Sequence, residues 1–68
     1  MKNIAEKLKD ARQRLGFSQE YVAKCFGIGR SAVTQIELGN RKITAEEIQK
    51  FCQLYHVSAY YLLNQESF

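Results

Sequence analysis

The sequence has no proline and no tryptophan, and only four glycines interrupt its 68 residues. Small β domains depend on glycine and proline at their many turns, so this composition favours helices. No apolar run approaches the roughly 20 residues that cross a bilayer, and the N-terminal residues mix charged with apolar side chains, without the core of a signal peptide. We therefore expect one small helical domain in the cytoplasm, with no membrane partner.

Metal ligands and catalytic groups are also scarce. Cys25 and Cys52 lack the close spacing of a zinc site, and His56 is the only histidine. In a reducing compartment both cysteines are expected to be reduced and structural. No nucleophile or carboxylate motif accompanies His56, which favours a helix C-cap over a general base. The sequence therefore predicts no enzyme activity, no cofactor and no metal site.

The net charge of +3 is unevenly distributed along the chain. Residues 1–42 contain nine basic and four acidic residues, a balance of +5, whereas residues 43–68 contain one basic and three acidic residues, a balance of −2. A polyanion would be attracted to the first part of the chain. Ordinary solvated helix faces would carry similar charges, so charge alone does not decide between these two interpretations.

Apolar residues recur at helical spacing, and no segment alternates as a strand does. The first expected helix ends at Gly16 and carries one apolar stripe, formed by Ile4, Leu8, Ala11 and Leu15. Ser18 is a good N-cap for a second helix, and Gly27 can end that helix with left-handed backbone. Gly29 stands at the N-cap position of a third helix and offers it no side-chain oxygen.

Two further helices complete the pattern. The fourth opens with the capping box Thr44-Ala45-Glu46-Glu47, in which Thr44 reaches forward and Glu47 reaches back. The fifth is short and follows the N-cap Ser58, and residues 64–68 are expected to fray. Residues 1–68 are therefore predicted to form a single all-α domain, a compact bundle of five helices.

The stretch from Gln19 to Glu37 reads as a short helix, a tight turn and a second short helix. Val33 and Ile36 mark the buried side of that second helix. Its other side carries polar groups of the kind that reach base edges in a DNA major groove: Arg30, Ser31, Thr34 and Gln35. These residues would be ordinary on an exposed face of an unrelated bundle. Their position directly after a helix and a glycine turn favours DNA binding.

Several short motifs follow one another in a fixed order. They are Arg14-Leu15-Gly16, Ser18-Gln19-Glu20, Ala23 with Gly27, Val33 with Ile36, Glu37-Leu38-Gly39-Asn40-Arg41, and Tyr55-His56-Val57-Ser58 leading to Tyr61-Leu62-Leu63. In this order and spacing, from Ile4 to Leu63, the chain resembles the helix-turn-helix domain of phage-repressor and Cro-like transcriptional regulators, the XRE family. The resemblance implies a lambda-repressor-like DNA-binding fold with the helix-turn-helix at about residues 18–37.

The resemblance also implies roles for single residues. The helix Arg30–Glu37 would lie in the major groove, with Arg30, Ser31, Thr34 and Gln35 in base-reading positions. A bidentate contact from Arg30 to guanine, or from Gln35 to adenine, would each contribute roughly 1–3 kcal/mol of discrimination. Contacts to the DNA backbone would come from Ser18, Gln19, Asn40, Arg41 and Lys42.

Two other features come with the resemblance. Arg12 and Glu37 match a pair that forms a buried ion pair in relatives, tying the first helix to the end of the third. The chain also departs from the family at Gly29, where serine or threonine is frequent, and at Leu38, where a polar residue often meets DNA. Both departures reduce the number of expected DNA contacts.

We therefore predict a sequence-specific DNA-binding transcriptional regulator, a repressor-type homodimer on double-stranded DNA with two-fold symmetry. Half-sites would lie about 34 Å apart if the dimer resembles others with this motif. Of Tyr60 and Tyr61, we expect one in the core and one at the dimer interface.

Three alternatives stay open. The domain could belong to an antitoxin or a controller protein with a protein partner, or it could be the N-terminal part of a longer regulator. A redox sensor that uses Cys25 is the third.

Overall fold

The computed structural model describes residues 3–64. Within this range the chain forms α1 (Ile4–Leu15), α2 (Gln19–Phe26), α3 (Arg30–Leu38), α4 (Ala45–Tyr55) and α5 (Ala59–Leu63), and it contains no strand. The predicted all-α architecture of five helices is therefore confirmed. Of residues 64–68, which are predicted to fray, residues 65–68 lie outside the described part of the chain.

The helix starts follow from local side-chain chemistry. Ser18, Thr44 and Ser58 each accept a hydrogen bond from a backbone N–H three residues on, as expected for N-caps. The capping box of Thr44 with Glu47 is present in both directions. Gly29 makes no capping hydrogen bond at the start of α3, because glycine has no side chain. A second capping box, formed by Asn3 and Glu6 at the start of α1, was not predicted.

The helix ends use left-handed backbone. Gly16, Gly27 and Gly39 end α1, α2 and α3 with positive φ. His56 ends α4 with a φ of 56°, and no other non-glycine residue of the described chain has a positive φ. The interpretation of His56 as a helix C-cap is therefore confirmed.

Residues from all five helices build the core. The largest side chains with essentially no exposed surface are Leu8, Val22, Val33, Ile36, Phe51 and Leu62. Leu15, the last residue of the apolar stripe predicted for α1, is not part of the core, because 42% of its surface is exposed. Leu15 lies in the last turn of α1, on the wall of an open hollow between α1 and α4, so nothing covers it.

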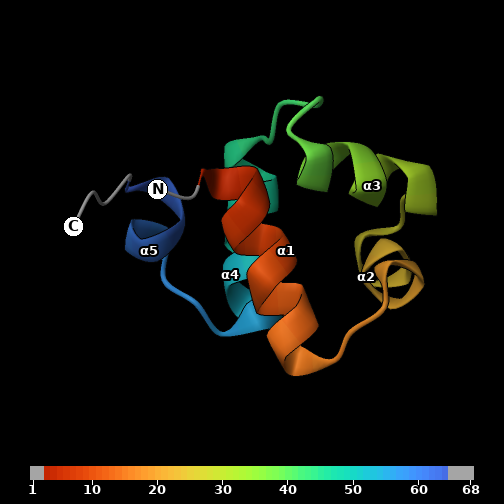
Figure 1. Ribbon diagram of the computed structural model, residues 1–68, viewed down its shortest axis with the longest axis horizontal. Helices are drawn as coiled ribbons and strands as arrows, with labels where there is room; N and C mark the ends of the chain where they lie inside the picture. Colours follow the sequence, from red (N-terminus) through yellow and green to blue (C-terminus); the bar gives the residue numbers. More distant parts are fainter. Residues whose placement is uncertain (1–2, 65–68) are drawn as a thin grey trace.

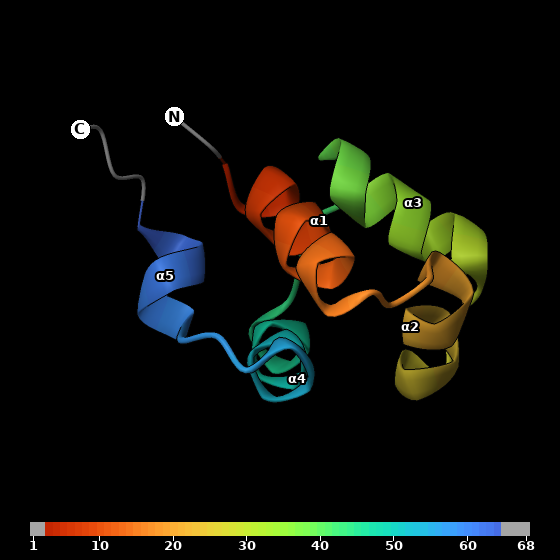
Figure 2. The ribbon, with the colours of Figure 1, turned by 60° about the horizontal axis from the view of Figure 1, so that its bottom comes forward.

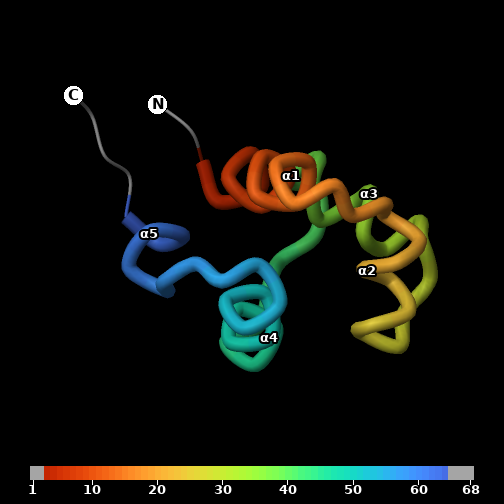
Figure 3. The backbone as a smooth tube through the Cα atoms, turned by 90° about the horizontal axis from the view of Figure 1, so that it is seen from below, coloured from red at the N-terminus to blue at the C-terminus, as the bar shows by residue number. Residues whose placement is uncertain are grey.

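Helix α1 lies at the centre of the arrangement (Figure 1). It packs against α3, α4 and α5, while α2 packs mainly against α3. The pair α2–α3 lies on one side of α1 and α5 lies on the other, as the two turned views agree (Figures 2 and 3). None of the helices in residues 3–64 combines the length and apolarity that a membrane span requires.

Candidate nucleic-acid interface

Helix α3 separates its polar side chains from its apolar ones. Val33 and Ile36 are buried in the core. Arg30, Ser31 and Gln35 are exposed, and Thr34 is half-buried. The four predicted base-reading residues therefore come together on the outer surface of one helix, where no other helix covers Arg30, Ser31 or Gln35.

A buried ion pair fixes the end of α3 to α1. Arg12 Nε donates to Glu37 Oε2 at 2.6 Å, and Arg12 Nη2 donates to Glu37 Oε1 at 3.1 Å. Arg12 Nη1 also donates to the carbonyl oxygen of Phe17 at 2.8 Å. The hydrogen bonds that Arg12 donates to Glu37 outweigh the opposing effect of burial and raise the pKa of Arg12. The bidentate geometry constrains both the position and the rotation of α3.

Gln19 extends this network to the outer surface of α3. Its Nε2 donates to Glu37 Oε1 at 3.0 Å. Its Oε1 accepts from Thr34 Oγ1 at 3.0 Å and from Arg30 Nε at 3.4 Å. A carboxylate only accepts hydrogen bonds, so the amide nitrogen must face Glu37 and the amide oxygen must face α3. The hydrogen-bond partners therefore determine the orientation of the Gln19 amide.

This orientation bears on the expected phosphate contact of Gln19. The amide oxygen that faces Arg30 and Thr34 is an acceptor, and an ionised phosphate offers it no hydrogen to accept. A phosphate bound at this position would contact the remaining amide hydrogen or the backbone at the start of α2. The Gln19 bridge was not predicted, because it joins residues 15 and 18 positions apart that meet only through the packing of α2 on α3.

The loop after α3 carries the three residues that are predicted to contact the DNA backbone, and they differ in their partners within the protein. Asn40 Nδ2 donates to Gln35 Oε1 at 3.1 Å. Arg41 forms a bidentate pair with Glu47, with nitrogen–oxygen distances of 3.2 and 2.9 Å. Lys42 is exposed and makes no hydrogen bond or ion pair with residues 3–64. Of these three side chains, only that of Lys42 is unengaged within the described chain.

The start of α4 depends on the same loop. The Arg41 guanidinium, helped by the backbone N–H of Thr44, holds the pKa of Glu47 below its ordinary value against the opposing effect of burial. Glu47 therefore closes the capping box of α4 and also anchors Arg41. The first role of Glu47 was predicted from the sequence, and the second was not.

The remaining residues singled out in the sequence are Leu38, Ser18 and the two cysteines. Leu38 is 63% exposed at the end of α3. The Ser18 hydroxyl accepts a hydrogen bond from the backbone N–H of Tyr21 at 3.0 Å, so it serves as the cap of α2. Cys25, which is exposed, and Cys52, which is half-buried, are both free thiols.

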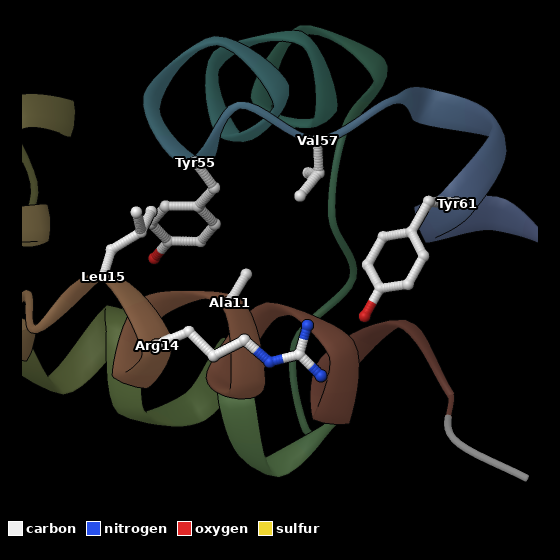
Figure 4. Close-up of a pocket in the computed structure, with 6 residues that line it drawn as sticks. All are labelled: Ala11, Arg14, Leu15, Tyr55, Val57 and Tyr61. Carbon is white, nitrogen blue, oxygen red and sulfur yellow. The ribbon is translucent and has the colours of Figure 1, made fainter.

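On the far side of α1 from α3, a hollow of about 360 Å³ opens between α1, α4 and α5 (Figure 4). Its lining consists of Ala11, Arg14, Leu15, Tyr55, Val57 and Tyr61, without a carboxylate or a thiol. Burial and the charge of Glu37 raise the pKa of Tyr55, whose hydroxyl has no hydrogen-bond partner in the described chain. No three His, Cys, Asp or Glu residues within 3–64 gather as a metal site would require.

Helix α5 places its two tyrosines differently. Tyr60 is 69% exposed, and Leu63, three residues on, is 61% exposed. Tyr61 is half-buried and packs against the core. Figure 4 shows the Tyr61 ring reaching from α5 toward α1. Tyr60 and Leu63 thus form a small apolar surface on the outside of the fold.

Two comparisons with known proteins bear on these features. Residues 8–62 match a family described as helix-turn-helix. The chain is 31% identical over 64 residues to the HTH-type transcriptional regulator ImmR of Bacillus subtilis (strain 168). That match covers 94% of this chain and 50% of the relative, so the chain spans about half the length of the curated relative it matches.

Proposed function

This chain belongs to the XRE family of helix-turn-helix proteins, and from that premise we propose that it is a sequence-specific DNA-binding transcriptional regulator. In this proposal α3 enters the major groove. Arg30, Ser31, Thr34 and Gln35 face the base edges, and the protein acts in the cytoplasm as a repressor-type homodimer.

The observation that carries the proposal is the outer surface of α3 and the way it is held. Arg30 and Thr34 both donate hydrogen bonds to Gln19, which is itself fixed by Glu37. Base discrimination requires side chains placed to within a fraction of an ångström, and such placement comes from hydrogen bonds to a rigid support.

Contacts to the DNA backbone would flank this reading surface. The start of α2, at Ser18 and Gln19, offers N–H groups and the positive end of the helix dipole to a phosphate. Asn40, Arg41 and Lys42 lie in the loop that directly follows α3. In this proposal Lys42 supplies a free charge, whereas Arg41 serves mainly to shape the loop through Glu47.

The two-fold operator of the proposal requires two copies of the chain. Tyr60 and Leu63 form an exposed apolar pair on α5, and tyrosine is enriched at protein interfaces. Helix α5 lies across α1 from α3 (Figure 3), so pairing through it would leave both α3 helices free to face DNA.

The proposal is tested by selecting bound sequences from a random DNA pool, then titrating the selected site and a scrambled site against salt. We expect steep salt dependence on both sites and at least about a thousandfold preference for the selected one. Arg30→Ala should reduce that preference by about tenfold or more. Arg14→Ala, which removes the same charge away from α3, should leave it unchanged. Equal binding to both sites by the wild type would refute sequence-specific regulation.

A further inference from the structure

Lys7 lies on the buried side of α1, with only 6% of its surface exposed. Its Nζ donates to the carbonyl oxygen of Tyr61 at 2.7 Å and also to the carbonyl oxygen of Asn64. The same Nζ lies 5.1 Å from the centre of the Tyr61 ring. One ammonium of α1 therefore makes three contacts with the C-terminal end of α5.

These contacts compensate for what α5 lacks. A five-residue helix is too short to be stable by itself, and its last carbonyl groups have no partners within the helix. A positive charge is also favourable at the C-terminal end of a helix. Burying an ammonium is costly unless its hydrogens are bonded, and here two carbonyl oxygens and an aromatic ring surround it. Removing it would leave the Tyr61 and Asn64 carbonyls without this donor.

Helix α1 carries a second buried cation, one that points to the other side of the fold. Arg12 holds Glu37 of α3, and Lys7 holds the end of α5. Since α3 and α5 lie on opposite sides of α1 (Figure 2), the position of one relative to the other is set through α1. Each of these two helices is attached to α1 by a buried charged group.

We propose that Lys7 is a positioning residue that holds α5, together with Tyr60 and Leu63, in a fixed place relative to α3. This inference rests on the proposed function, because it assigns to Lys7 the distance between the two α3 helices of a dimer paired through α5. Lys7 touches no DNA in this proposal. It acts on operator binding only through the geometry of the pair.

The test compares Lys7→Met, which keeps an unbranched stem and removes the ammonium, with Lys9→Met. Lys9 is exposed on the same helix, so its substitution makes the same change of charge and sequence without touching α5. In Lys7→Met we expect the amide hydrogens of Leu62 and Asn64, which bond to Ser58 and Tyr60, to exchange at least about tenfold faster. The amides of α3 should keep their protection, and Lys9→Met should match the wild type.

The second measurement is affinity for an operator with two half-sites and for a single half-site. Lys7→Met should weaken binding to the full operator by about tenfold and leave half-site binding within about twofold. Unchanged exchange in α5, or an equal rise throughout the chain, would overturn the positioning role. Faster exchange confined to α5 with an unchanged ratio of the two affinities would overturn the link to dimer geometry. A wild type without operator preference would instead refute the proposed function, while the exchange result would still report on Lys7.

Discussion

Gln19 donates an amide hydrogen to Glu37 Oε1 at 3.0 Å, so the first residue of α2 is bonded to the last turn of α3. Glu37 is buried and already paired with Arg12. The opposite end of the Gln19 amide accepts hydrogen bonds from Arg30 and Thr34. A chain of hydrogen bonds therefore runs from the buried face of α1 to the outer face of α3.

The first prediction concerns Gln19. Gln19→Ala should lower the preference for the selected operator over a scrambled site by about tenfold, because Arg30 and Thr34 lose their shared acceptor. Competitive binding measurements on the two sites give this ratio directly. Gln49→Ala, on the exposed face of α4, is the matched control. Loss of affinity by the same factor on both sites would show that Gln19 contacts phosphate and does not position the reading residues.

The second prediction concerns the pair of Arg12 and Glu37. Glu37→Leu should lower the free energy of unfolding by about 3–5 kcal/mol, since it leaves a buried guanidinium without its carboxylate. The double substitution Arg12→Met with Glu37→Leu should recover much of this loss, because two apolar side chains replace two buried charges. Urea unfolding of the two single variants and the double variant measures the coupling. Additive losses would mean that the two side chains do not depend on each other.

The third prediction separates Lys42 from Arg41. Lys42→Ala should reduce the slope of log affinity against log salt by about one, as loss of one phosphate contact does. Arg41→Ala should change that slope less and lower the free energy of unfolding by up to about 1 kcal/mol, through loss of its partly exposed pair with Glu47. A reduction of the slope by about one in both variants would place both cations on the DNA backbone.

The fourth prediction is a pH dependence. The pKa of Glu47 is below its ordinary value in the folded chain, so the unfolded chain binds the proton more readily. The resulting stability is present above about pH 4.3, the ordinary glutamate pKa, and is lost as the pH falls below it. Unfolding free energies measured from pH 6 to pH 3 should therefore fall less in Glu47→Gln than in the wild type. Glu46→Gln, at an exposed neighbouring position, should follow the wild-type curve.

The fifth prediction concerns His56, whose φ of 56° is unfavourable for a residue with a Cβ atom. His56→Gly should raise the free energy of unfolding by a few tenths to about 1 kcal/mol. His56→Ala keeps the Cβ atom and should give no such gain. Thermal unfolding of both variants distinguishes the backbone effect from loss of the imidazole, since only the backbone effect separates glycine from alanine.

Most of the local structure could be predicted from the sequence. Helix starts at Ser18, Thr44 and Ser58 depend on hydrogen bonds to N–H groups three residues away, and the end at His56 depends on backbone within the same turn. The outward face of α3 follows from helical periodicity around Val33 and Ile36. The capping box of Asn3 with Glu6 is equally local, so it could also have been predicted from the sequence.

The contacts that hold the candidate site could not be predicted from the residues alone, and the family resemblance suggested only one of them. The pairing of Arg12 with Glu37 joins residues 25 positions apart, and it was expected from the resemblance alone. The Gln19 bridge and the contacts of Lys7 were not expected. The burial of Lys7 could have been inferred from its position, since it lies on the apolar stripe of α1 between Ile4 and Ala11. A lysine is rarely buried without a partner, however, and the sequence does not show its partner.

The five helices, their caps and the polar face of α3 therefore follow from the sequence alone, because each depends on interactions within one or two helical turns. Which polar groups of different helices meet depends on the way the helices pack. This packing brings Lys7 to the end of α5 and turns the Gln19 amide oxygen toward Arg30 and Thr34. Such contacts depend on how α1, α3 and α5 pack, and residues up to 57 positions apart carry no local pattern that links them.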